Sequence, residues 1–110
     1  MKSYWIDEIP SADMEKIRDE LERISTRSGV ENLYWITLPD DLSSEVQFSH
    51  PKCKPHLMAL ELGPTWIRLE LFVRNLQRMS CSCHAYATPS QVSFAINFAD
   101  RLIERLGVRT

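Results

Sequence analysis

Residues 88–107 constrain the fold of this chain most, because they carry a complete set of signals for one amphipathic helix. Thr88 and Gln91 have the spacing of a capping box, in which each side chain accepts an amide hydrogen bond at the start of a helix. Pro89 suits the first helical position, since its ring already holds the required backbone angle. Apolar residues then recur every three or four positions, and Gly107 can adopt the left-handed conformation that ends a helix. Any fold of this chain must therefore bury one face of this helix.

A strand is predicted immediately before the helix. In residues 79–86, small apolar side chains, among them Cys81 and Cys83, alternate with polar ones, so they share one face of an extended chain. The segment that begins at Trp66 alternates in the same way. We expect the two segments to form an antiparallel hairpin with Trp66 opposite Tyr86. Both cysteines would then be buried against the helices as small hydrophobic residues.

Three further segments, residues 2–9, 31–38 and 56–62, have the aromatic, β-branched or alternating apolar residues of strands. A second amphipathic helix with a charged outer face is expected between Ser11 and Gly29. The order strand, helix, strand favours a right-handed crossover with a parallel pair of strands. The predicted fold class is α+β: a two-layer α/β sandwich with a mixed sheet of about five strands, in the order β-α-β-β-β-β-α, and both helices on one face.

Length and charge limit the domain organisation and the partners. A chain of 110 residues is expected to form one α/β domain, residues 1–110. The net charge of −2, with acidic and basic residues interspersed, predicts neither nucleic acid nor a membrane as a partner. No apolar run approaches the roughly 18 residues of a membrane span, and the first ten residues lack the apolar core of a signal peptide. Because three cysteines accompany no export signal, a reduced, cytoplasmic protein is expected.

All cysteines and histidines lie in two short windows, residues 50–56 and 81–84. Thiolate and imidazole are preferred ligands of zinc. The clustering therefore indicates an alternative function, a small zinc- or thiol-dependent protein, with these candidate ligands: Cys53, Cys81, Cys83 and His56.

The spacing argues against this alternative. In an extended strand, the Cα atoms of Cys81 and Cys83 would lie about 6.6 Å apart, which is awkward for one tetrahedral ion. Cys53 lies between Lys52 and Lys54, whose charges would lower the pKa of an exposed loop thiol. The first expectation is therefore that the protein has no cofactor, that Cys81 and Cys83 are core residues, and that Cys53 is a loop cysteine.

The outward face of the predicted hairpin is the preferred binding surface. Large aromatic residues with a polar rim are typical of protein interfaces, and the helices would leave this side of the sheet uncovered. No arrangement typical of nucleophilic catalysis is present. We therefore expect a non-catalytic binding or assembly domain that forms a homo-oligomer or binds another protein through these residues: Trp66, Arg68, Glu70, Phe72, His84 and Tyr86.

Overall fold

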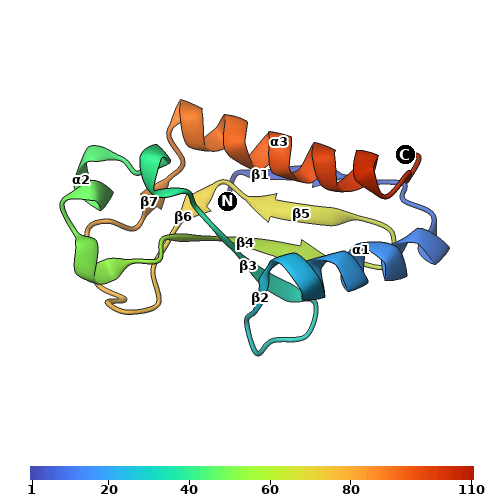
Figure 1. Ribbon diagram of the computed structural model, residues 1–110, viewed down its shortest axis with the longest axis horizontal. Coiled ribbons are helices and arrows are strands. Elements are labelled where there is room, and N and C mark those ends of the chain that lie inside the picture. The colour runs from blue at the N-terminus through green and yellow to red at the C-terminus, as the bar shows by residue number, and fades with distance from the viewer.

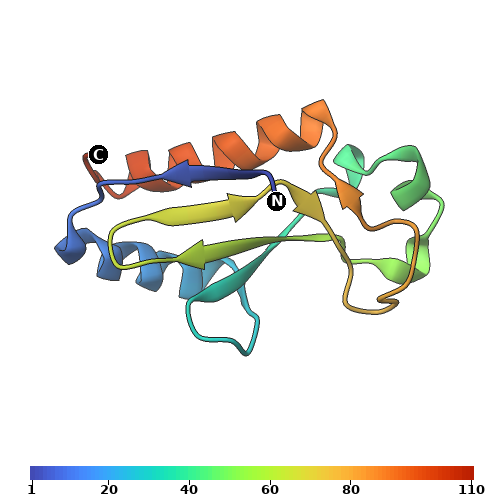
Figure 2. The same cartoon turned by 180° about the vertical axis from the view of Figure 1, so that it is seen from behind.

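Two layers, a β-sheet and a pair of long helices, make up the computed structural model, which describes residues 1–110 (Figure 1). The helices α1 (Ser11–Ile24) and α3 (Pro89–Arg105) lie on the same face of the sheet. Figure 2 shows the sheet from the other side, with no helix in front of the strands. The predicted α+β sandwich with both long helices on one face is therefore confirmed.

The main sheet has five strands in the order β1-β5-β4-β3-β2, and every neighbouring pair is antiparallel. Its strands are β1 (Ser3–Ile6), β2 (Thr26–Arg27), β3 (Leu33–Thr37), β4 (Leu57–Leu62) and β5 (Ile67–Glu70). The predicted mixed sheet with a parallel crossover is thus wrong. After α1 the chain makes the short β2–β3 hairpin, so β3 has β2 and β4 as neighbours and β1 pairs with β5 instead.

Alternation along the strands places the hydrophobic core between the sheet and the helices. On β5, Ile67 and Leu69 are buried, while Arg68 and Glu70 are partly exposed on the other face. Leu60 of β4 lies beside Leu69 and is fully buried. Both α1 and α3 contribute buried side chains to the same cluster, which explains why two amphipathic helices pack on one sheet face.

Helix α3 begins and ends as its sequence predicts. The Thr88 hydroxyl accepts the Gln91 amide at 3.3 Å, and the Gln91 side-chain oxygen accepts the Thr88 amide at 3.0 Å. Gly107 has a φ of 68°, in the left-handed region. These signals are local in sequence, which is why they specify the helix without reference to the rest of the fold.

The connection from β3 to β4 forms three short helices at one end of the sheet, at the left in Figure 1. They are η1 (Asp40–Leu42), α2 (Glu45–Phe48) and η2 (Pro51–Cys53). Helix α2 has its own capping box, formed by Ser44 and Gln47. The Gln91 side-chain amide donates to the Gln47 side-chain oxygen at 2.8 Å, so the two capping boxes are joined and α2 is tied to the start of α3.

The predicted hairpin from Trp66 to Tyr86 is wrong in register and in extent. A small second sheet pairs β6 (Phe72–Val73) with β7 (Ala85–Tyr86), and Tyr86 lies opposite Phe72 rather than Trp66. Residues 75–84 form a loop in place of a strand. The side-chain oxygen of Asn75 accepts the amides of Gln77 and Arg78, at 2.9 and 2.5 Å, which closes a turn that competes with strand pairing.

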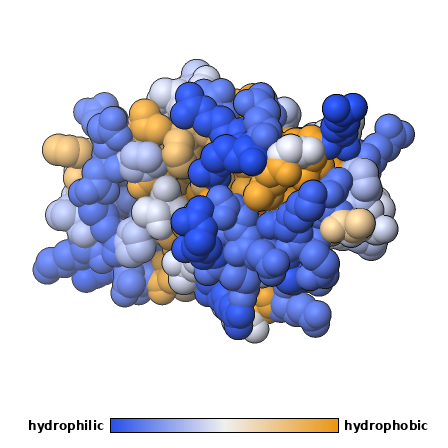
Figure 3. Space-filling model, turned by 45° about the vertical axis from the view of Figure 1, so that its right-hand side comes forward, coloured by the Kyte–Doolittle hydropathy of each residue, from blue (hydrophilic) through white to orange (hydrophobic).

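The surface in Figure 3 is largely hydrophilic, with apolar patches between polar and charged side chains. The outer positions of α1 contribute to this character, since the helix buries only Met14, Ile17 and Leu21. None of the helices is both long enough and apolar enough to cross a membrane.

Candidate functional site

Three cysteine sulfurs meet at the end of the sheet that carries the short helices. Cys53 comes from η2, and Cys81 and Cys83 come from the loop of residues 75–84. The three sulfur atoms all lie within 4.8 Å of one another, and the Cys53 thiol donates a hydrogen bond to the Cys81 sulfur at 3.5 Å. None of them forms a disulfide. We call this group the three-sulfur cluster.

Turns in the loop bring the sulfurs together. The amide of Cys81 donates to the Arg78 carbonyl at 3.1 Å, and the amide of His84 donates to the Cys81 carbonyl at 3.4 Å. The backbone is therefore folded back at Cys81 and Cys83 instead of extended, and the objection to their spacing in a strand does not apply. The predicted burial of Cys83 is confirmed, whereas Cys81 is partly exposed and its predicted burial is wrong. Neither cysteine belongs to the main core cluster between the sheet and the helices.

The three thiols have different environments. Cys53 and Cys83 are each 1% exposed, whereas Cys81 is partly exposed. Burial raises the pKa of Cys53, so its predicted role as an exposed loop thiol with a lowered pKa is wrong. The backbone amide of Cys83, followed by its thiol, donates hydrogen bonds that lower the pKa of Cys81 to about 7. Burial, with hydrogen bonds to the other two sulfurs, raises the pKa of Cys83 to about 12. Cys81 is therefore the thiol of the cluster that loses its proton most readily.

Two buried amide side chains hold the cluster in place. Asn75 is fully buried, and its side-chain amide donates to the Cys83 sulfur at 3.1 Å. The side-chain amide of Gln47 donates to the Cys83 carbonyl at 3.2 Å, which links the loop to α2. The sequence predictions missed both residues. The signal for Gln47 was its position in a Ser-x-x-Gln capping box, and the signal for Asn75 was its tendency to close turns.

None of the three histidine side chains lies in the three-sulfur cluster. His56 is 3% exposed, its Nε2 atom has no hydrogen-bond partner, and burial followed by the charge of Lys54 lowers its pKa. The Nε2 atom of His84 accepts the backbone amide of Asn75 at 3.2 Å. The Nδ1 atom of His50 lies 2.5 Å from the Val46 carbonyl oxygen. Of the four predicted metal ligands, the structure thus brings together the three cysteines but not His56.

The dimensions of the cluster suit a tetrahedral metal ion. A zinc–sulfur distance of 2.3 Å places two thiolates of one tetrahedral site about 3.8 Å apart. The observed separations, 3.5 Å between the Cys53 and Cys81 sulfurs and at most 4.8 Å within the group, bracket this value. Three cysteine sulfurs from two segments of the chain could therefore hold one soft divalent cation.

Part of the predicted binding surface lies on the sheet face opposite the helices, the side shown in Figure 2. The indole of Trp66 packs against that of Trp5, with ring centroids 4.9 Å apart. A side chain at Gly63 would collide with the Trp66 ring, so glycine at this position lets the indole lie over the turn between β4 and β5. Arg68 lies over the Trp5 ring and pairs with Glu61 at 2.8 Å.

The other end of this face carries a second aromatic pair. Phe72 and Tyr86 meet edge to face, with centroids 5.3 Å apart. Arg74 lies over Phe72 and pairs with Glu70 at 2.8 Å. His84 does not lie opposite Arg68 as predicted, because the loop carries it toward Asn75. We call the following set the aromatic sheet face: Trp5, Trp66, Arg68, Glu70, Phe72 and Tyr86.

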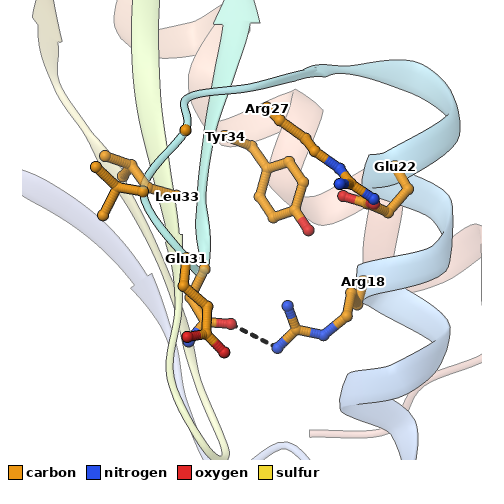
Figure 4. A pocket seen from close by; sticks show the side chains of 9 residues that line it. Arg18, Glu22, Arg27, Glu31, Leu33 and Tyr34 are labelled. Atoms are coloured by element: carbon orange, nitrogen blue, oxygen red, sulfur yellow. Dashed lines mark hydrogen bonds and ion pairs between the residues drawn. The ribbon is translucent and has the colours of Figure 1, made fainter.

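A pocket of about 410 Å³ lies between α1 and the β2–β3 hairpin (Figure 4). The Tyr34 side chain points into it between two arginines. Arg27 pairs with Glu22, and Arg18 donates to the Asn32 side-chain oxygen at 2.6 Å. Since both arginines already have partners within the chain, neither is free to bind a ligand, and the three-sulfur cluster is the stronger candidate site.

The three-sulfur cluster is thus the most distinctive chemical feature of the molecule. Comparisons with protein-family models, with curated proteins and with solved structures found no match.

Proposed function

We propose that this chain is a small zinc-binding domain in which Cys53, Cys81 and Cys83 hold the metal. The observation that supports this function is the convergence of three sulfurs within 4.8 Å, although Cys53 and Cys81 are 28 residues apart. Cysteines that serve only as small hydrophobic residues have no need to contact one another. A zinc ion accounts for all three at once, because thiolate is its preferred soft ligand.

A metal also accounts for the cluster better than a disulfide does. A disulfide joins only two sulfurs and leaves the third without a role, whereas one metal ion can bind all three. A bound zinc ion deprotonates the thiols that ligate it. Its charge would offset the cost of burying thiolates at the two positions that are 1% exposed.

The proposed metal has a structural role at this end of the molecule. It joins η2 to the loop of residues 75–84, a region with little regular secondary structure of its own. Small or loop-rich regions commonly use a metal where packing alone contributes little stability.

The test is the metal content of the purified protein and its response to loss of one ligand. We expect about one zinc ion per chain by elemental analysis, and we expect cobalt substitution to produce intense thiolate-to-cobalt absorption. Cys83→Ser should abolish both signals. Ser82→Ala is the matched control, because it changes the exposed neighbour between the two cysteines and should retain the metal. Wild-type protein that is metal-free and takes up neither ion would refute the proposal.

Self-association through the aromatic sheet face is the second candidate function. The exposed fractions of Trp5 and Tyr86, 52% and 54%, favour it, since large aromatic side chains often anchor protein contacts. The partner expected at the aromatic sheet face is a second copy of this chain. Arg68 of this face is paired with Glu61, and Glu70 is paired with Arg74, so a twofold axis would bring two patches of balanced charge together without repulsion.

Sedimentation over a range of concentrations tests this second function. We expect Trp5→Ala and Tyr86→Ala each to raise the dimer dissociation constant about 30-fold, which corresponds to a loss of about 2 kcal/mol, while the monomer stays folded. Val30→Ala, at an exposed position in the turn before β3, is the control and should leave association unchanged. A wild-type protein that is monomeric at every concentration would exclude self-association.

A further inference from the structure

A tetrahedral zinc ion on the three-sulfur cluster would have one position left to fill. Structural zinc sites have four protein ligands, whereas sites with three keep a water molecule or a substrate at the fourth position. Imidazole is the common partner of three thiolates, and the chain has three histidines.

Two of the histidines are poorly placed. The Nε2 atom of His84 is occupied by the Asn75 backbone amide at 3.2 Å. Hydrogen bonds fix the backbone at His56. Its carbonyl accepts the Leu38 amide at 2.9 Å, and the next residue, Leu57, exchanges two backbone hydrogen bonds with Arg74. With the side chain 3% exposed, its imidazole has little room to move.

His50 has the hydrogen bonding expected of a metal ligand. Its Nδ1 atom lies 2.5 Å from the Val46 carbonyl oxygen, which makes Nδ1 the protonated nitrogen and leaves the lone pair on Nε2. Ligating histidines almost always donate their other ring N–H to a backbone carbonyl or a carboxylate in this way. His50 also directly precedes η2, and the Cys53 amide donates to its carbonyl at 3.0 Å. Two residues separate His50 from Cys53, which is a common spacing for zinc ligands.

There is space for the imidazole to approach the sulfurs. His50 and Cys53 line the same cavity of about 260 Å³, together with Lys52 and Arg78. This cavity is the space through which Nε2 would approach the sulfurs.

We propose that His50 is the fourth ligand of the zinc ion and completes a site with three cysteines and one histidine. This inference rests on the proposed zinc-binding function. With four protein ligands, the metal has no open position for a substrate, so the site stabilises structure and does not catalyse a reaction.

The experiment compares zinc-loaded wild-type protein with His50→Ala and with His84→Ala, the matched control. A competing chelator is added in steps, and the released zinc is measured. We expect His50→Ala to release zinc at a chelator concentration roughly 100-fold lower than wild type does, and His84→Ala to behave as wild type. In cobalt-loaded protein, added imidazole should change the visible spectrum of His50→Ala only, because only that variant has an open position.

The outcomes separate the two proposals. A wild-type protein that binds neither zinc nor cobalt refutes the zinc site itself. A wild-type protein that binds both, with a His50→Ala variant of equal affinity and no response to imidazole, refutes only the role of His50. Loss of affinity in His84→Ala in place of His50→Ala also refutes it. Nitrogen-15 NMR of wild-type protein gives a check without a variant: zinc should shift the His50 Nε2 resonance strongly, and an unchanged resonance contradicts the assignment.

Discussion

Removal of zinc from the loaded protein by a chelator is expected to lower its Tm by on the order of 15 °C. A ligand present at about 1,000 times its dissociation constant stabilises the native state by about 4 kcal/mol. For a domain of this length, each kcal/mol corresponds to roughly 4 °C. The lost stability belongs to η2 and the loop of residues 75–84, which contain no residue of the main core cluster. Scanning calorimetry before and after chelation measures the shift, and added zinc should reverse it.

Two variants show whether the shift comes from the three-sulfur cluster. Cys83→Ser should melt at the same temperature with and without the chelator, because it has no metal to lose. Ser82→Ala should respond as wild type does. An unchanged Tm in wild-type protein, or an equal shift in Cys83→Ser, would contradict a structural metal at this site.

Leu60→Ala is expected to lower the free energy of unfolding by about 2–5 kcal/mol. Leu60 is fully buried in the middle of β4, where it lies between Tyr34 of β3 and Leu69 of β5. The variant loses the burial of the leucine side chain and leaves a cavity that the surrounding sheet can only partly close. The corresponding fall in Tm is roughly 8–20 °C, and urea denaturation measures the free energy directly.

Val30→Ala provides the contrast for this measurement. Val30 is 64% exposed, so its truncation should change stability by no more than about 0.5 kcal/mol. If Leu60→Ala were as stable as Val30→Ala, the core would not lie between β4 and the helices as described.

Local signals in the sequence predicted the parts of the fold that local interactions determine. The capping box at Thr88 and the left-handed Gly107 specify α3 by contacts within one or two turns. The alternation along β5 correctly identified Ile67 and Leu69 as buried, because the side-chain period of a strand follows from its backbone geometry.

Strand pairing was predicted less well, since it depends on residues far apart in the sequence. The alternation in residues 79–86 is real, but the side chain of Asn75 closes a turn that redirects the chain before it can form a long hairpin. The low expectation for a metal site followed from this error, because it assumed an extended strand at Cys81 and Cys83. Once these residues are in turns, their sulfurs can meet that of Cys53.

The position of β1 at the edge of the sheet has a consequence for the order in which the chain folds during synthesis. Its only strand partner is β5, and Ile6 pairs with Ile67, about 60 residues later. The β4–β5 hairpin, in contrast, closes over a short turn and can form as soon as it is made. Strand β1 is therefore synthesised before β5 and can pair only after β5 has been made. Until then Tyr4 and Ile6 have no neighbouring strand.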